Sequence, residues 1–146
     1  MRDGRKESYM NNRITLSSFS SRDKEWLREL LIDKNVRKFL PHLTTDVDVF
    51  TNDMGIAERN GLGKFWIIRL DGVGIGFISI YDLTENPFIF YAMLLAYRSK
   101  GYMKKALRMI ENKYSSFLYT IVESCNIPSL KVLGRTRIIG MYNLKE

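Results

Sequence analysis

The chain has 146 residues, 45% of them hydrophobic and 27% charged, and this length allows one domain over residues 1–146 but excludes two full domains. The apolar content suffices for a buried core, which excludes an intrinsically disordered protein, and the longest apolar run, residues 88–95, is shorter than the ~20 residues that cross a bilayer. The formal net charge is +7, and the segment from Arg98 to Arg137 carries a net +7 by itself, with nine basic residues against two acidic ones.

Residues 1–12 are charged and polar, and we expect them to form a flexible N-terminal segment. They contain no apolar stretch of the kind that secretory signals carry. Cys125 is the only cysteine, so no disulfide can form within the chain. Both features predict a cytoplasmic protein.

The next part of the chain predicts one strand followed by helical segments. Ile14 and Leu16 alternate with polar residues, which is the period of a half-buried strand. Capping residues then precede apolar side chains at helical spacing. In chain order, the expected elements are a strand over residues 13–19, a helix from caps at 20–23 to near Asp33, a short apolar turn over 36–40 and a helix over 46–60.

The clearest local signal is a pair of β-rich runs, residues 64–70 and 74–81, joined at Asp71-Gly72. Both residues of this dipeptide tolerate the positive φ of a tight hairpin turn, so the two runs predict a β-hairpin. A third, strongly buried strand is expected over residues 88–95.

The rest of the chain alternates helices and strands. The expected elements are a helix over residues 101–118, a strand over 119–122, a helix over 127–135 opened by Pro128 and a last strand over 138–144. A meander followed by strand, helix and strand implies an α/β (α+β) fold, in which helices pack on the faces of a mixed sheet.

The connection between the third strand and the following helix, AYRSKG, has the character of an anion site. Its glycine, Gly101, leads directly into a helix N-terminus, which presents unpaired N–H groups and a partial positive charge. Arg98, Lys100 and Lys104 add full charges beside it. The alternative is that Gly101 only makes a tight turn.

The basic segment around this turn has two interpretations. It can attract a polyanion, such as nucleic acid, an acidic protein, anionic lipid or the phosphates of a nucleotide cofactor. It can equally form the solvated face of a helix.

Several stretches of the sequence, taken in order, form a family pattern. They are ITLSSF, DKNVRKFLP, Gly76-Phe-Ile, FIFYAM, Arg98-Ser-Lys-Gly101-Tyr-Met103 and Asn126-Ile-Pro-Ser129-Leu-Lys-Val132-Leu133. Over roughly residues 13–138 they resemble the RimJ/RimL-like branch of the GNAT superfamily of N-acetyltransferases, and the segment from Arg98 to Met103 is similar to the acyl-CoA motif of that superfamily, Arg/Gln-x-x-Gly-x-Gly/Ala. The resemblance implies a mostly antiparallel central sheet flanked by helices, with an acyl-CoA cleft between two splayed strands.

The resemblance further implies an N-acetyltransferase in which a primary amine attacks the thioester of acetyl-CoA directly, without a covalent enzyme intermediate. By residue match, the strand backbone around Met93, Leu94 and Leu95 would pair with pantetheine, and one of its N–H groups would polarise the thioester carbonyl. Asn126 matches the residue that binds the pantetheine arm. The pyrophosphate would be held by the backbone of Arg98, Ser99, Lys100, Gly101, Tyr102, Met103 and Lys104.

Two catalytic roles are expected from the same resemblance. Ser129 matches the residue beside the CoA sulfur, where a hydroxyl can protonate the departing thiolate. Glu123 is the first candidate for the base that deprotonates the amine, and Asp82 and Glu85 are alternatives. The alternative is that Asn126 and Ser129 only cap a helix and that the three carboxylates are ordinary surface groups.

Two residues depart from the family pattern and one class of site is not expected. Ser99 replaces a common glycine of the phosphate loop, and Phe90 replaces the glycine of a Gly-Tyr pair. No metal site is expected, because His42 is the only histidine and Cys125 the only cysteine.

Three functions therefore remain open. The first is an acetyl-CoA-dependent N-acetyltransferase acting on a protein N-terminus or a small-molecule amine. The second is a non-catalytic acyl-CoA-binding protein of the same fold, and the third is a basic module that binds nucleic acid or the ribosome, although no motif for such binding is present. No membrane partner is expected, and homodimerisation is left open.

Overall fold

The computed structural model describes residues 12–40, 43–81, 88–113, 119–123 and 137–142. Three longer helices, three short helical segments and six strands occur within these ranges. In chain order they are β1 (Ile14–Ser17), η1 (Ser21–Asp23), α2 (Lys24–Ile32), α3 (Lys34–Phe39), α4 (Val47–Arg59), β2 (Gly63–Leu70), β3 (Val73–Tyr81), β4 (Phe88–Met93), η2 (Leu95–Tyr97), α5 (Tyr102–Lys113), β5 (Tyr119–Glu123) and β6 (Arg137–Tyr142).

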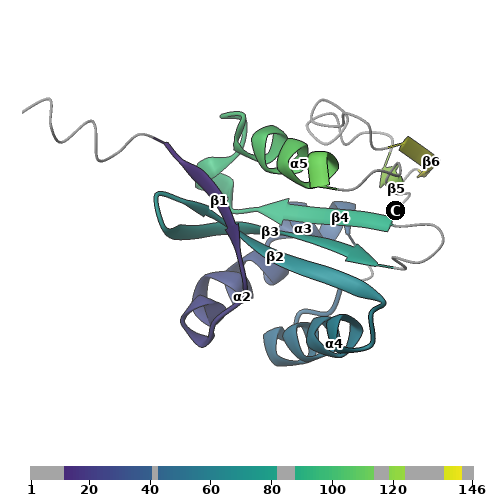
Figure 1. Cartoon of the computed structure of the whole chain (residues 1–146), viewed down its shortest axis with the longest axis horizontal. Helices are drawn as coiled ribbons and strands as arrows, with labels where there is room; N and C mark the ends of the chain where they lie inside the picture. Colours follow the sequence, from purple (N-terminus) through teal and green to yellow (C-terminus); the bar gives the residue numbers. More distant parts are fainter. Residues whose placement is uncertain (1–11, 41–42, 82–87, 114–118, 124–136, 143–146) are drawn as a thin grey trace, which may run out of the picture.

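The strands form one mixed sheet in the order β1-β2-β3-β4-β5-β6. Neighbours from β1 to β4 are antiparallel, whereas β4 and β5, and β5 and β6, are parallel. Figure 1 shows α5 on one side of the sheet and α2 and α4 on the other. The prediction of a mixed, mostly antiparallel sheet flanked by helices is confirmed.

The hairpin between β2 and β3 forms where the sequence predicts it. Asp71 and Gly72 both have positive φ, at 49° and 88°, which suits the twist of a tight hairpin. The Asp71 carboxylate also accepts hydrogen bonds from the backbone N–H groups of Asn12 and Arg13, at 3.3 and 2.9 Å. The turn therefore anchors the start of β1 as well as joining two strands.

Two hydrophobic clusters cover the two faces of the sheet. Alternate residues of β2, β3 and β4 point to opposite faces, so each of these strands contributes to both clusters and reads as a nearly continuous apolar run. The α5-side cluster includes Leu107 and Ile110, and the cluster under α2 and α4 includes Leu30 and Phe50. Phe90 belongs to the second cluster, where its ring lies edge-on to Phe77 at 6.1 Å.

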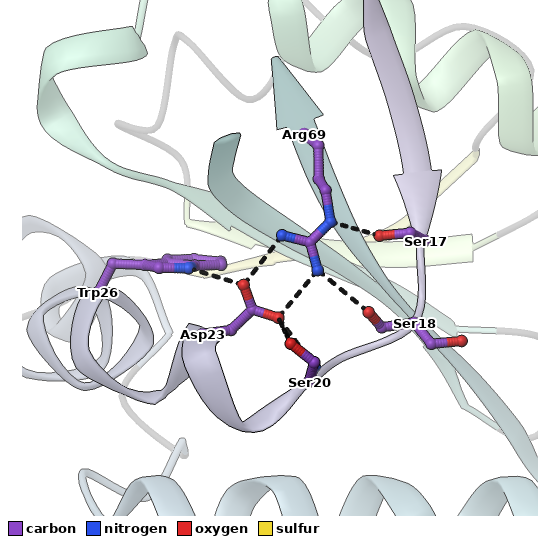
Figure 2. Close-up of polar contacts among 6 residues, drawn as sticks. All are labelled: Ser17, Ser18, Ser20, Asp23, Trp26 and Arg69. Atoms are coloured by element: carbon purple, nitrogen blue, oxygen red, sulfur yellow. Dashed lines mark hydrogen bonds and ion pairs between the residues drawn. The ribbon is translucent and has the colours of Figure 1, made fainter. Parts of the chain in front are cut away.

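A buried ion pair joins β1, β2 and the start of α2 (Figure 2). Arg69 donates to the two carboxylate oxygens of Asp23, both at 2.9 Å, and to Ser17 Oγ at 2.6 Å and Ser18 O at 3.2 Å. Asp23 also accepts from Trp26 Nε1 at 3.0 Å and from the Ser20 backbone N–H at 2.8 Å. Because both charges are hydrogen-bonded on several sides, the fold can tolerate burying them.

Some expected elements differ in extent from those observed. The third strand ends at Met93 and not at residue 95, because η2 begins at Leu95, a residue that is 65% exposed. The apolar turn expected over residues 36–40 is part of a six-residue helix, α3. The helix expected over residues 101–118 is present as α5 up to Lys113, and the rest of it lies outside the described residues, as does the helix expected over 127–135.

Candidate functional site

The candidate site begins where β4 and β5 separate. These parallel strands pair only at Phe88 and Tyr119, near the start of each strand. No later residue of β5, which is described to Glu123, pairs with β4, although β5 stays paired with β6 along its whole length. The two strands therefore splay apart toward Met93 on one side and Glu123 on the other, as the fold prediction requires.

The backbone of Met93 faces this splay. Leu94 donates its N–H to Ile75 O of β3 at 2.9 Å, and Met93 is paired in register with Gly76. Since successive residues of a strand direct their N–H and C=O groups to opposite edges, those of Met93 point away from β3 and toward β5. Of the strand residues expected to pair with pantetheine, Met93 is the one whose backbone faces the splay.

The turn after β4 is closed by local hydrogen bonds and left-handed residues. Tyr97 and Arg98 donate their backbone N–H groups to Leu94 O and Leu95 O, at 3.0 and 3.1 Å. Ser99 and Gly101 then have φ of 63° and 86°. The serine that replaces a family glycine thus keeps the left-handed backbone that favours glycine.

The N-terminus of α5 follows directly. Its first backbone hydrogen bond runs from Lys105 N–H to Gly101 O, at 3.1 Å, so the N–H groups of Tyr102, Met103 and Lys104 precede the helical ladder. Lys100 and Lys104 are exposed beside this turn. Backbone donors, the helix dipole and two lysines therefore lie together at this turn, and anion binding there stays a prediction.

The Arg98 side chain turns back toward the strand. Its Nε donates to Met93 O at 2.7 Å, and its Nη2 lies 3.5 Å from Asp33 Oδ2. The two side chains of this ion pair are about a quarter exposed, at 24% and 25%. Arg98 therefore contributes its charge to the end of β4, and its backbone N–H is already bonded to Leu95 O.

The expected site residues fall into three groups. The backbones of Met93, Ser99, Lys100, Gly101, Tyr102, Met103 and Lys104 lie along one continuous connection from the splay to the helix start. Leu94 and Arg98 use their N–H groups elsewhere, and Leu95 begins η2. Glu123 ends β5, opposite Tyr142 of β6, while Asp82, Glu85, Asn126 and Ser129 lie outside the described residues.

One residue that contacts the candidate site, Asp33, was not expected there from the sequence. Asp33 lies between α2 and α3, where its Oδ1 accepts from the N–H groups of Asn35 and Val36, at 2.8 and 3.3 Å. An aspartate before a helix is a recognisable N-cap, so the sequence could have indicated this role. Its contact with Arg98 joins residues far apart in the chain, and no local pattern reports such a contact.

Two further classes of site receive no support from the described chain. Within the residues that the structure describes, no helix has both the length and the apolar character needed to span a membrane. In the same residues, no three histidine, cysteine, aspartate or glutamate side chains form a group that could hold a metal ion. His42 and Cys125 lie outside the described part.

Comparison with known proteins identifies relatives of the chain. The family model for the acetyltransferase (GNAT) domain matches residues 13–138, and no curated protein matches the sequence. Among solved structures, RimL, a ribosomal L7/L12 alpha-N-protein acetyltransferase in complex with coenzyme A, is similar with a TM-score of 0.69 and 13% identity, over 82% of this chain and 76% of that one.

Two other solved structures are similar in fold. RimJ from Mycobacterium smegmatis, in complex with CoA-disulfide, has a TM-score of 0.68 and 20% identity, over 85% of this chain and 69% of that one. Spermidine N-acetyltransferase from Vibrio cholerae, in complex with CoA and spermine, has a TM-score of 0.58 and 10% identity, over 66% and 60%. The resemblance to the RimJ/RimL-like branch is confirmed at the level of the fold.

Proposed function

Because the chain belongs to the acetyltransferase (GNAT) domain family, we propose that it transfers an acetyl group from acetyl-CoA to a primary amine. The observation that supports this function most directly is the arrangement of the connection from β4 to α5. The Met93 edge of the splay and the open first turn of α5 lie at its two ends. An acyl-CoA needs these two features together, a strand edge for pantetheine and backbone donors for pyrophosphate.

Different residues of this connection contact different parts of acetyl-CoA in the proposed complex. The pantetheine arm lies along the Met93 edge, and the N–H of Met93 donates to the thioester carbonyl, whose oxygen gains negative charge as the amine attacks. The N–H groups from Ser99 to Lys104 hold the pyrophosphate. Lys100 and Lys104 add charge without being buried.

Proton transfer completes the proposed reaction. The amine must be neutral to attack, and its reference pKa is about 8 for an α-amine or about 10.4 for lysine, so a base is required. Glu123 at the end of β5 is our first candidate, with Asp82 and Glu85 as alternatives, and Asn126 is assigned to the pantetheine arm. The thiolate of CoA then leaves and takes a proton, for which Ser129 is the proposed donor.

The acceptor is proposed from the relatives. RimL is an alpha-N-protein acetyltransferase, which favours a protein N-terminus, and spermidine N-acetyltransferase offers a small polyamine as the alternative. A peptide with the N-terminus of ribosomal protein L7/L12 and free spermine are therefore the two acceptors to try first.

The test of cofactor binding is thermal unfolding with acetyl-CoA, CoA, ATP or inorganic pyrophosphate. A ligand that binds only the native state adds about 2.7 kcal/mol to the free energy of unfolding at a hundredfold excess over Kd. For a chain of this size, this raises the Tm by several degrees. We expect a shift specific to acetyl-CoA and CoA. Equal shifts with all four polyanions would favour a general anion surface, such as a nucleic-acid-binding module, and would contradict the proposal.

A matched pair of glycine variants localises the binding. Gly101 and Gly61 both have positive φ, at 86° and 71°, and a Cβ added to either meets no atom within 4 Å. Gly101→Trp should abolish the CoA shift by covering the helix start, whereas Gly61→Trp, at the end of α4, should lose similar stability and keep the shift. Release of free thiol from acetyl-CoA with each acceptor then separates an enzyme from a binding protein.

A further inference from the structure

The contacts of Arg98 connect two parts of the molecule that the sequence keeps separate. One part is the edge of β4 at Met93, which faces the splay, and the other is the junction between α2 and α3 at Asp33. A single guanidinium touches both. Its position depends on η2, because the 3₁₀ turn over Leu95–Tyr97 carries the chain back toward the end of the strand.

The hydrogen bond from Arg98 Nε to Met93 O acts directly on the proposed site. In a strand, the C=O and N–H of one residue point to the same edge, so holding the carbonyl also fixes the direction of the N–H. The bond is 2.7 Å long and its donor is charged, which makes it stronger than a bond between neutral groups. Arg98 therefore orients the N–H that would polarise the thioester.

The contact with Asp33 in turn orients Arg98. Arg98 Nη2 is buried and makes no hydrogen bond within the described residues, so its attraction to Asp33 Oδ2 at 3.5 Å is electrostatic. Asp33 is itself fixed, because its other oxygen caps α3. The carboxylate is thus held from one side by a helix N-terminus and acts on the guanidinium from the other.

We propose that Arg98 and Asp33 form a positioning pair that couples the α2–α3 junction to the acetyl-transfer step. The inference rests on the proposed function and deepens it. The pair does not bind the cofactor in this account. It sets the geometry of the Met93 backbone, so its loss should lower kcat and leave the affinity for CoA nearly unchanged.

Two single variants and their combination test the pair. Asp33→Asn keeps a good N-cap for α3 and removes only the charge that faces Arg98. Arg98→Gln removes the charged group that donates to the Met93 carbonyl. Arg98→Lys replaces it if the glutamine variant does not fold, because a lysine cannot contact both Met93 O and Asp33. Asp48→Asn is the control, since it breaks the 2.6 Å ion pair between Lys24 of α2 and Asp48 of α4.

The measurements are kcat with the acceptor that the wild-type protein acetylates, either the L7/L12 peptide or spermine, and Kd for CoA. We expect Asp33→Asn to lower kcat roughly two- to fivefold, the effect of a partly exposed ion pair. Arg98→Gln should lower kcat about tenfold through loss of a charged hydrogen bond. Adding Asp33→Asn to Arg98→Gln should cause no further loss, and Asp48→Asn should leave kcat unchanged.

The outcomes separate this inference from the function on which it rests. Wild-type protein that neither binds CoA nor releases thiol would overturn the proposed function. If the wild-type protein is active, the positioning role is overturned by unchanged kcat in Asp33→Asn, by additive losses in the double variant, or by a loss of CoA affinity equal to the loss of kcat. A structural role alone would lower Tm and leave kcat at permissive temperature unchanged.

Discussion

At the scale of single residues, the balance of burial against hydrogen bonding is clearest at Asp23. Burial raises the pKa of its carboxyl, and this is the largest single effect. It is outweighed by hydrogen bonds from Arg69, Ser20 and Trp26 and by the charge of Arg69, which together lower the pKa from 3.8 to about 2. The folded state therefore strongly prefers the carboxylate.

This preference predicts how stability depends on pH. The pKa of Asp23 is lower in the folded state than in the unfolded state. Its ionised carboxylate therefore adds about 2 kcal/mol to the free energy of unfolding above pH 4, and this contribution is lost as the pH falls through about 2. At pH 7, Asp23→Asn should lower the free energy of unfolding by about 3 kcal/mol, because it leaves Arg69 buried without its counter-charge. Urea denaturation at several pH values measures both effects.

The control for the Asp23 variant is Asp53→Asn, which changes an exposed carboxylate on α4. This variant should change the free energy of unfolding by less than about 0.5 kcal/mol at every pH measured. A difference between wild-type protein and Asp23→Asn that stays constant from pH 7 to pH 2 would show that the carboxylate charge is not the source of the stability.

At the scale of elements, α2 packs closely on β3 through Trp26 and Gly74. A Cβ added at Gly74 would lie 2.6 Å from Cζ2 and Nε1 of the Trp26 indole, closer than any real contact. The same indole donates to Asp23, so it cannot move away without losing that hydrogen bond. The absence of a side chain at Gly74 therefore sets how near the helix approaches the sheet.

Gly74→Ala should lower the free energy of unfolding by about 1–3 kcal/mol through overpacking against the indole. Val73→Ala is a suitable comparison, because Val73 is the neighbouring strand residue and is 57% exposed. Thermal and urea denaturation of both variants give the difference. If Gly74→Ala is as stable as Val73→Ala, the helix moves freely on the sheet and the close approach is not required.

At the scale of the whole molecule, the central strands belong to both hydrophobic clusters. Strands β2, β3 and β4 each direct alternate side chains to α5 and to the helices on the opposite face. Because the same strands contribute side chains to both clusters, loss of the strand structure disrupts the packing on both faces. The two faces should therefore unfold together in one transition.

The two tryptophans test this cooperativity, because Trp66 packs with the α5-side cluster and Trp26 with the opposite one. In Trp26→Phe, the remaining fluorescence reports the α5 face, and in Trp66→Phe it reports the other. Each fluorescence curve in urea should coincide with the circular dichroism curve of the same variant. Leu107→Ala should lower the free energy of unfolding by about 2–5 kcal/mol, so both reporters should unfold at a lower urea concentration. A reporter whose midpoint did not move would contradict a single cooperative unit.

The sequence by itself determined the elements whose signals are local. The hairpin follows from Asp71-Gly72, whose backbone needs positive φ, and the helix start at Tyr102 follows from the glycine before it. The segment from Met93 to Lys104 could likewise be proposed as an acyl-CoA site from its resemblance to a family motif, because that motif is contiguous. Periodicity and turn chemistry act between near neighbours, so they are legible without a structure.

Only the tertiary structure decided which groups of this candidate site already have hydrogen-bond partners. The apolar run through Leu95 looks like strand throughout, yet Leu95 is exposed and η2 redirects the chain. Leu94 gives its N–H to β3, and Arg98 turns its side chain toward Met93 and Asp33. These contacts join segments far apart in sequence, and their energies depend on the packing that brings them together, which no local pattern encodes.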